Sequence, residues 1–279
     1  MRLLPLTLLL AGCAGGAPAG LDTPPLRVLS YNVRYGTAKD GENHWDQRKD
    51  LCAARAVEFK PDLAGLQEAL DFQNAHLRAA LGDYGQIGAA REDGKEKGEF
   101  TTILYRKARL EAVESGTFWL SETPELAGSK SWDSSLPRIA TWALFRDTQA
   151  GGREFLYVNT HFDHKGPKSR VEAAKLIRAF VEKRGLAAPV IVTGDFNSGP
   201  GSEPYRALVG TLVDSWLVLH PEPAEGTSHP FNGKPTTPRI DWILCSPAFE
   251  VKEAAIDRHH DGGRYPSDHF PVGAVLAWR

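Results

Sequence analysis

The sequence predicts an α+β domain made of short strands and a few helices. Short apolar runs of strand length recur along the chain, and only a few amphipathic segments with helical spacing lie between them. The chain has 279 residues, of which 42% are hydrophobic and 24% charged, a composition that fits one large globular domain and argues against disorder or a coiled coil. We therefore expect one domain over residues 26–279.

The segment before this domain is predicted to direct export. Residues 1–12 combine a charged start with an apolar core, as a signal peptide does. The stretch Leu10–Cys13 resembles a bacterial lipobox, in which Cys13 would be lipidated; the alternative is an ordinary secretory signal with an incidental cysteine. Residues 13–25 are rich in Gly, Ala and Pro and are expected to form a flexible tether. We expect a protein that is exported and lipid-anchored in the bacterial cell envelope, at the outer membrane, or secreted.

Strands are expected where short apolar runs end in polar or turn-forming residues. They are Leu26–Tyr31, Leu63–Leu66, Thr101–Tyr105, Ala140–Phe145, Phe155–Asn159, Val190–Thr193, Asp241–Leu244 and Val272–Ala277. Helices are expected over Arg48–Phe59, which Pro61 ends, and over Phe72–Leu81, which Gly82 ends. A third helix is expected over Ser169–Lys183, where apolar residues recur at helical spacing.

Charge and cysteine content limit the classes of partner. The formal net charge is −2, so the chain has no overall basic surface to hold nucleic acid, although a local cluster of Arg and Lys could still line a cleft. Cys52 and Cys245 are expected to be buried free thiols, and a disulfide between them is the alternative in an exported protein. No apolar run after Leu10 is long enough to cross a bilayer, so we expect membrane contact only through a lipid anchor.

Polar residues of metal-ligand and acid–base type follow the apolar runs at the points where several strands end. Each one alone could cap a helix or brace a turn. Their joint occurrence in this order indicates one cleft at a sheet edge. The residues are Asn32, Glu68, His161, Asp195 and Asn197 after strands, Asp241 at the start of one, and Asp268 and His269 before the last.

The ordered set N…QE…H…GDFN…IDW…SDH resembles the endonuclease/exonuclease/phosphatase superfamily. That superfamily includes pancreatic deoxyribonuclease, abasic-site endonucleases, poly(A) deadenylases, inositol polyphosphate 5-phosphatases and bacterial sphingomyelinases. The resemblance extends from about Leu26 to Arg279. It implies a four-layer α/β/β/α sandwich of two mixed β-sheets, with helices outside and the active site at one edge.

Phosphate ester hydrolysis gives these residues their expected roles. Hard oxygen ligands suit Mg²⁺, with Mn²⁺ possible, and the metal candidates are Asn32, Glu68 and Asp268. Asp195 is expected to orient or deprotonate the attacking water while Asn197 donates to the phosphoryl group. Their side chains are expected to project together, because positions two apart share one face of an extended chain.

The two histidines are expected to supply protons or hydrogen bonds to the scissile phosphate. His161 and His269 each need a carboxylate to fix the tautomer, and the family pattern implies Asp241 and Glu99, in either pairing. The resemblance also implies phosphate-facing groups. These are Arg138, Tyr105 and Arg170.

Three further features have competing interpretations. Asp163, His164 and Lys165 could form a second metal site around His161, or Asp163 could brace the loop while His164 is exposed. The polar loop at residues 258–263 resembles a metal cluster but is expected to be solvated. Stacking on a base or sugar is the alternative to core packing for three tryptophans, Trp45, Trp119 and Trp132.

The sequence therefore predicts a Mg²⁺-dependent phosphoesterase of phosphodiesterase or nuclease type at the cell envelope. The alternative is a phosphatase or phospholipase-type enzyme for a small or lipid-borne phosphoester, and a catalytically silent envelope binding domain is a remote one. The expected partners are a phosphoester substrate, which is nucleic acid or a small or lipid phosphoester, and the membrane through the anchor. We expect a monomer.

Overall fold

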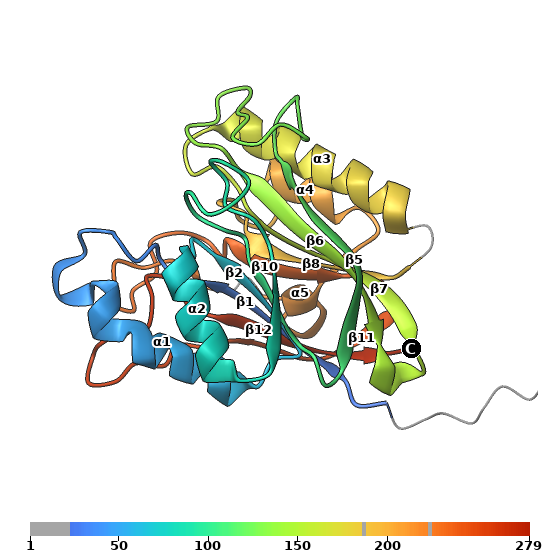
Figure 1. The fold of residues 1–279 in the computed structure, drawn as a ribbon, viewed down its shortest axis with the longest axis horizontal. Helices are drawn as coiled ribbons and strands as arrows, with labels where there is room; N and C mark the ends of the chain where they lie inside the picture. The colour runs from blue at the N-terminus through green and yellow to red at the C-terminus, as the bar shows by residue number, and fades with distance from the viewer. Residues whose placement is uncertain (1–22, 186–187, 223–224) are drawn as a thin grey trace, which may run out of the picture.

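The computed structural model describes residues 23–185, 188–222 and 225–279. The predicted signal segment, Cys13 and most of the predicted tether lie outside the described residues. Two six-stranded mixed sheets pack face to face, with helices on the outside of each (Figure 1). This confirms the expected four-layer α/β/β/α sandwich. Among the described residues, no helix combines the length and the apolar character needed to span a bilayer.

The first sheet has the strand order β11-β12-β1-β2-β4-β3. Its strands are β1 (Leu26–Asn32), β2 (Leu63–Gln67), β3 (Tyr84–Ile87), β4 (Ile103–Arg106), β11 (Phe249–Ile256) and β12 (Val272–Trp278). Strand β1 runs parallel to β2 and antiparallel to β12. Helices α1 (Trp45–Phe59) and α2 (Asp71–Leu81) cover the outer face (Figure 1).

The second sheet has the order β5-β6-β7-β8-β10-β9. Its strands are β5 (Leu110–Trp119), β6 (Ile139–Asp147), β7 (Arg153–His161), β8 (Val190–Asp195), β9 (Val213–Asp214) and β10 (Asp241–Cys245). Helices α3 (Pro167–Gly185) and α4 (Glu203–Val209) cover its outer face (Figure 1), and α5 (Ser215–Leu219) contacts β10 and β11. Short 3₁₀ helices span Gly41–Asn43 and Thr148–Ala150.

Side chains point alternately to the two faces of each sheet, which creates three apolar layers: one between the sheets and one between each sheet and its helices. In β7, Phe155 and Tyr157 face the other sheet, whereas Leu156 and Val158 face α3. Burying one such large side chain stabilises the fold by about 1.5–3 kcal/mol. Both Cys52 and Cys245 are buried free thiols, as expected.

A layer of buried polar side chains lies between the two sheets, next to the carboxyl ends of the central strands. The Asn159 amide donates to the backbone oxygens of Leu66 (2.8 Å) and Thr102 (3.0 Å) in the opposite sheet. Its oxygen accepts hydrogen bonds from Gln67 Nε2 (2.8 Å) and Thr193 Oγ1 (3.1 Å). One side chain therefore links both sheets directly beneath the strand ends.

The opposite end of the sandwich is held by Arg109. Its guanidinium donates to Asp62 (2.9 Å) in the first sheet's connection and to Asp147 (2.9 Å) at the end of β6. It also donates to the backbone oxygens of Pro24 and Pro25, immediately before β1. The start of the domain is thus fixed at the end away from the polar layer.

Candidate active site

A cavity of about 520 Å³ opens at the edge where the carboxyl ends of β1, β2, β7 and β8 meet. Most of the residues expected at the site line it. The lining residues are Arg34, Tyr35, Glu68, Arg91, Glu99, Leu136, Arg138, His161, His164, Asp195, Asn197, Asp268 and His269.

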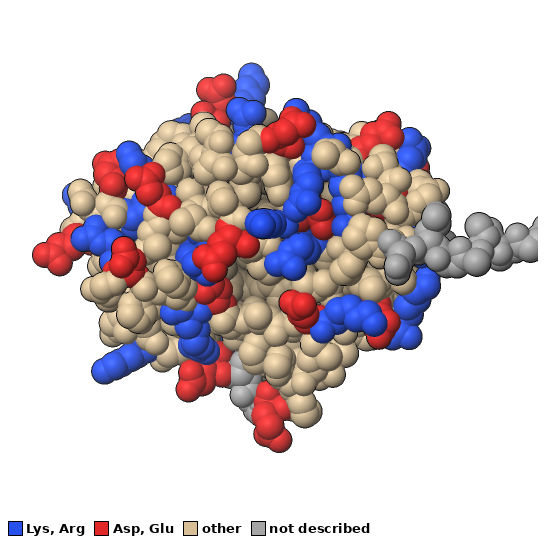
Figure 2. All heavy atoms as spheres, turned by 90° about the horizontal axis from the view of Figure 1, so that it is seen from below, with Lys and Arg blue, Asp and Glu red and all other residues tan. Residues whose placement is uncertain are grey.

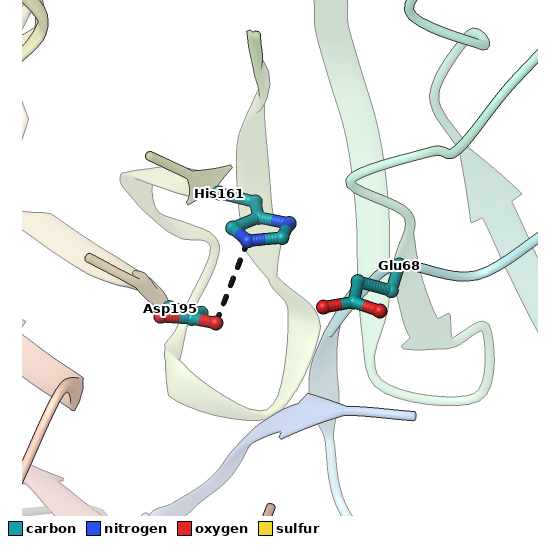
Figure 3. A group of neighbouring side chains, drawn as sticks. All are labelled: Glu68, His161 and Asp195. Carbon is teal, nitrogen blue, oxygen red and sulfur yellow. Dashed lines mark ion pairs between the residues drawn. The ribbon is translucent and has the colours of Figure 1, made fainter. Parts of the chain in front are cut away.

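Strand register places the central groups side by side. Asp195, the last residue of β8, pairs with His161 of the parallel strand β7 and with Asp241 of the antiparallel strand β10. Figure 3 shows the side chains of Glu68, His161 and Asp195 pointing toward one another. Because these residues lie at the ends of buried strands or directly beside them, their backbone positions are fixed by the core.

Asp195 is the most deeply enclosed acid of the cavity. Its Oδ2 accepts a hydrogen bond from Asn32 Nδ2 (2.9 Å) and lies 3.5 Å from His161 Nε2 and 3.8 Å from His269 Nε2. Burial and the nearby charge of Asp241 raise the pKa of Asp195 to about 7. A base with a pKa near the working pH suits proton abstraction from water.

Asn197 reaches the cavity by a different geometry from the one expected. Its backbone is left-handed (φ 47°), and its N–H donates to Asp195 Oδ1 (2.9 Å), which makes an Asx turn. The prediction that the two side chains share one face of an extended strand is therefore wrong, because β8 ends at Asp195. Both residues nevertheless line the cavity.

His269 is paired with Asp241. Its Nδ1 lies 2.9 Å from Asp241 Oδ2, and both side chains are buried. Burial alone lowers the pKa of His269, but the carboxylates of Asp241 and Asp195 outweigh it and hold that pKa well above its usual value. His269 is therefore a protonated donor at neutral pH.

His161 has the opposite character because its Nδ1 faces Arg138 Nη1 at 3.0 Å. Burial, Arg138 and Arg91 hold the pKa of His161 well below its usual value. Since a guanidinium can only donate, Nδ1 of the neutral ring accepts and the proton lies on Nε2, facing Asp195.

Glu99 does not hydrogen-bond to either histidine. Both of its oxygens accept from Arg91, at 2.7 and 2.8 Å, and it lies 3.8 Å from His161 Nδ1. Burial and the charge of Glu68 raise the pKa of Glu99 to about 7. Asp241 is therefore the orienting carboxylate of His269, whereas Arg138 takes the place expected for a carboxylate at His161.

The metal candidates differ in the atoms that they present. Asn32 donates from Nδ2 to Glu68 Oε1 (3.0 Å) and to Asp195, while its oxygen accepts from Arg34 N–H (2.9 Å). In this metal-free arrangement Asn32 is a donor that joins two carboxylates, and its role as a metal ligand stays a prediction. Glu68 and Asp268 both line the cavity with carboxylate oxygens.

This oxygen set fits a hard divalent cation. Possible ligand atoms of Glu68, His161 and Asp195 lie within 4.8 Å of one another. His161 carries its proton on Nε2, so the carboxylates are the available ligands. Burial raises the pKa of Glu68, but the Asn32 hydrogen bond and the charges of His269 and Arg34 outweigh this effect. The pKa of Glu68 is therefore below its usual value, and Glu68 is ionised at neutral pH.

Two expected phosphate contacts lie elsewhere. Tyr105 shares the inner face of β4 with Ile103, and its ring packs 5.0 Å from that of Phe145 in the core between the sheets. Arg170 donates to the Asp163 backbone oxygen (3.0 Å) at the start of α3. Neither side chain lines the cavity, so both assignments are corrected to structural positions.

The loop around Asp163 serves the site indirectly. The Asp163 carboxylate accepts from Ser135 Oγ and from the backbone N–H groups of Lys165 and Gly166, so Asp163 braces the loop, as the interpretation without a second metal expected. His164 is exposed, but it lines the cavity and its Nδ1 lies 2.9 Å from Arg138 Nη2.

Core packing accounts for two of the tryptophans, because Trp45 and Trp119 are buried. Trp132 is half-buried, and residues 258–263 form an exposed loop, as expected. Trp119 donates to the Arg91 backbone oxygen (2.6 Å) and so supports a cavity residue from behind.

Several cavity residues were not predicted from the sequence. They are Arg34, Tyr35, Arg91 and Leu136. Arg34 and Tyr35 come two and three residues after Asn32 in "NVRYG", so their proximity to a predicted ligand was the available signal. Arg34 and Glu68 have left-handed backbones, at φ 55° and 60°, a conformation that sequence periodicity does not reveal.

The amino-acid sequence of this chain is similar to those of known proteins. The model of the Endonuclease/Exonuclease/phosphatase family matches residues 29–269. The protein angel of Drosophila melanogaster is 26% identical over 271 residues, covering 83% of this chain and 72% of that protein. Human nocturnin is 21% identical over 232 residues, covering 74% of this chain and 51% of that protein.

Solved structures share the architecture. A mannosyl-6-phosphatase of Bacteroides thetaiotaomicron has 38% identity and a TM-score of 0.83, covering 91% of this chain and 100% of that one. A Bacteroides vulgatus endonuclease/exonuclease/phosphatase has 35% identity and a TM-score of 0.84, covering 91% and 99%. Danio rerio TDP2, solved with a single-strand DNA product, has 19% identity and a TM-score of 0.72 over 91% and 99%, which shows the shared fold alone.

Proposed function

The chain belongs to the endonuclease/exonuclease/phosphatase family, and on that premise we propose that this phosphoester hydrolase uses Mg²⁺ to remove phosphate from a small phosphorylated carbohydrate. The observation that carries the proposal is the cavity. Its volume of about 520 Å³ falls within the roughly 300–1,000 Å³ typical of small-ligand pockets. That space suits one phosphate and a leaving group of sugar size.

The residues of the cavity have separate roles in the proposed hydrolysis. Asp195 takes the proton of the attacking water, and Asn32 holds its carboxylate in place. Protonated His269, fixed by Asp241, donates to a phosphoryl oxygen. Arg138 lines the same wall and has further N–H donors beyond the one that faces His161.

Glu68 and Asp268 would hold the divalent cation, with Asp195 beside them. A bound Mg²⁺ or Mn²⁺ would neutralise charge that develops on the phosphoryl oxygens. The carboxylates support this assignment because burying ionised oxygens without a cation is costly.

The choice of substrate rests on similarity and on charge. The mannosyl-6-phosphatase of B. thetaiotaomicron supports a phosphorylated sugar, because the identity of 38% extends over the whole of that chain. The net charge of −2 argues against a long nucleic acid. On the face shown in Figure 2, Lys and Arg are interspersed with Asp and Glu. Export with a lipid anchor at Cys13 and a monomeric state remain predictions.

A substrate panel tests the proposal. The purified domain, with and without Mg²⁺, is given mannose 6-phosphate, p-nitrophenyl phosphate, bis(p-nitrophenyl) phosphate, a phospholipid and plasmid DNA. We expect Mg²⁺-dependent release of phosphate from the two monoesters. Plasmid nicking without monoester turnover would replace the proposal with the nuclease function, and turnover of the phospholipid alone would replace it with a lipid-directed one.

A further inference from the structure

Arg34 lies in the cavity wall with a backbone that the surrounding structure holds in an unfavourable region. Its φ of 55° is left-handed, a backbone conformation that residues other than Gly, Asn and Asp seldom adopt. Such a conformation persists only where neighbouring groups enforce it, and it is often found at functional positions.

Buried side chains enforce this conformation from several directions. The Arg34 N–H donates to Asn32 Oδ1 (2.9 Å), and its carbonyl accepts from Gln73 Nε2 (2.9 Å) and Arg48 Nη2 (3.1 Å). Arg48 is itself buried and also donates to the carbonyls of Val33 and Pro266, both at 2.8 Å. The backbone of Arg34 is therefore fixed relative to the residues before Asp268.

The Arg34 guanidinium already forms an ion pair with a carboxylate, that of Asp40. Its Nε and Nη2 donate to the two oxygens of Asp40 at 3.0 and 2.9 Å, which is a bidentate pair. These bonds use two of the five N–H donors, and Nε also lies 3.7 Å from Asp268 Oδ2. The guanidinium carbon stacks 4.9 Å from the ring centre of Tyr35, which lines the same wall.

This arrangement distinguishes two kinds of ligand. An arginine without an anionic partner keeps its full positive charge for a second phosphate, whereas an arginine paired with a carboxylate offers a phosphate less attraction. Arg34 is neutralised by Asp40 through the bidentate pair. The remaining N–H donors, next to an aromatic ring, therefore suit uncharged hydroxyl groups.

We propose that the Arg34–Asp40 pair, with Tyr35, forms the subsite for the hydroxyl-rich leaving group and selects uncharged sugars over groups with a second negative charge. This inference rests on the proposed function, because it describes the leaving group of that reaction. Arg34 would contact the substrate, whereas Asp40, which does not line the cavity, is a positioning residue that sets the orientation and charge balance of Arg34.

The test compares the selectivity of variants rather than their activity alone. For the Mg²⁺-loaded full domain, kcat/KM is measured on mannose 6-phosphate, p-nitrophenyl phosphate and fructose 1,6-bisphosphate, which adds a second anionic group. We expect Arg34→Ala to lower the ratio of mannose 6-phosphate to p-nitrophenyl phosphate at least tenfold. Arg34→Lys should not restore the ratio, since an ammonium lacks the planar fork.

Asp40→Asn provides the opposite change. It leaves Arg34 with an unneutralised charge, so we expect the preference for the bisphosphate over mannose 6-phosphate to rise at least fivefold. The matched control is Arg264→Ala, since Arg264 is exposed and donates to the Gln47 backbone oxygen outside the cavity. The control should keep both ratios within twofold of the unmodified protein.

The outcomes separate this inference from the proposed function. Equal losses on both monoesters in Arg34→Ala, or an unchanged bisphosphate preference in Asp40→Asn, would overturn the subsite while leaving a sugar phosphatase in place. Failure of the unmodified protein to hydrolyse mannose 6-phosphate, together with plasmid nicking, would overturn the proposed function and the subsite with it.

Discussion

Asn159→Ala should destabilise the fold by about 2–4 kcal/mol, because Asn159 joins the two sheets beneath the cavity. After truncation, Gln67 Nε2 keeps Ser30 Oγ and the Gly65 carbonyl, and Thr193 Oγ1 keeps the Tyr157 hydroxyl. The Thr102 carbonyl keeps the Leu66 N–H, but the Leu66 carbonyl loses its side-chain donor. One weakened buried carbonyl costs about 1–3 kcal/mol, and a void of about 50 Å³ adds about 1 kcal/mol.

Urea denaturation followed by circular dichroism measures this change. The matched control is Glu154→Ala in the same strand, which removes a surface ion pair to Arg146 (2.8 Å) and should cost no more than about 1 kcal/mol. A free energy of unfolding for Asn159→Ala within about 1 kcal/mol of the unmodified protein, or equal to that of the control, would exclude a structural link between the sheets through Asn159. A loss confined to activity would likewise contradict a structural link between the sheets.

The remaining predictions concern the site and the anchor. Asp195→Asn should lower kcat by about 10²–10⁴-fold with an unchanged circular dichroism spectrum; retained activity would exclude Asp195 as the base. In metal-free protein the same variant should gain stability relative to the unmodified chain as the pH rises from about 4 to 7. The reason is that the folded pKa of Asp195, about 7, exceeds the unfolded value of about 3.9, so ionisation there destabilises the fold by about 2–4 kcal/mol; a pH-independent difference in urea midpoints would contradict this. EDTA should abolish hydrolysis and Mg²⁺ or Mn²⁺ restore it, whereas full activity in chelator would exclude the metal. Cys13→Ser should move the protein from membrane to soluble fractions, and an unchanged distribution would exclude lipidation.

Sequence patterns predicted those site residues that terminate buried strands. Glu68, His161 and Asp195 each follow an apolar run, and a strand end is a defined place in space. Tyr105 shows the limit of this reasoning, because it lies within a strand and has the parity of Ile103, so it points into the core. Arg34 was missed because its position depends on a left-handed turn enforced by Arg48, which is distant in the sequence.

The same limit applies to the fold. The expected central strands are present, with boundaries that differ by a few residues, and α1 begins earlier, at Trp45. Strand β5 was not predicted because charged Glu111 and Glu114 and flexible Gly116 interrupt its apolar pattern. It is an edge strand with one neighbour, so its exposed positions tolerate polar residues. Apolar periodicity reveals strands whose side chains are buried, and an edge strand such as β5 has few buried side chains.

Both ends of the domain lie on the side of the sandwich away from the cavity. Leu26 at the start of β1 pairs with Leu276 near the end of β12, and β1 rises about 20 Å from Leu26 to Asn32, whose side chain donates to Glu68 and Asp195 of the cavity wall. An added domain, a purification tag or a solid support can therefore be joined at either end without crossing the entrance to the cavity. If Cys13 is lipidated, the tether would join the domain at the end away from the cavity, so the anchor would leave the entrance open to a water-soluble sugar phosphate.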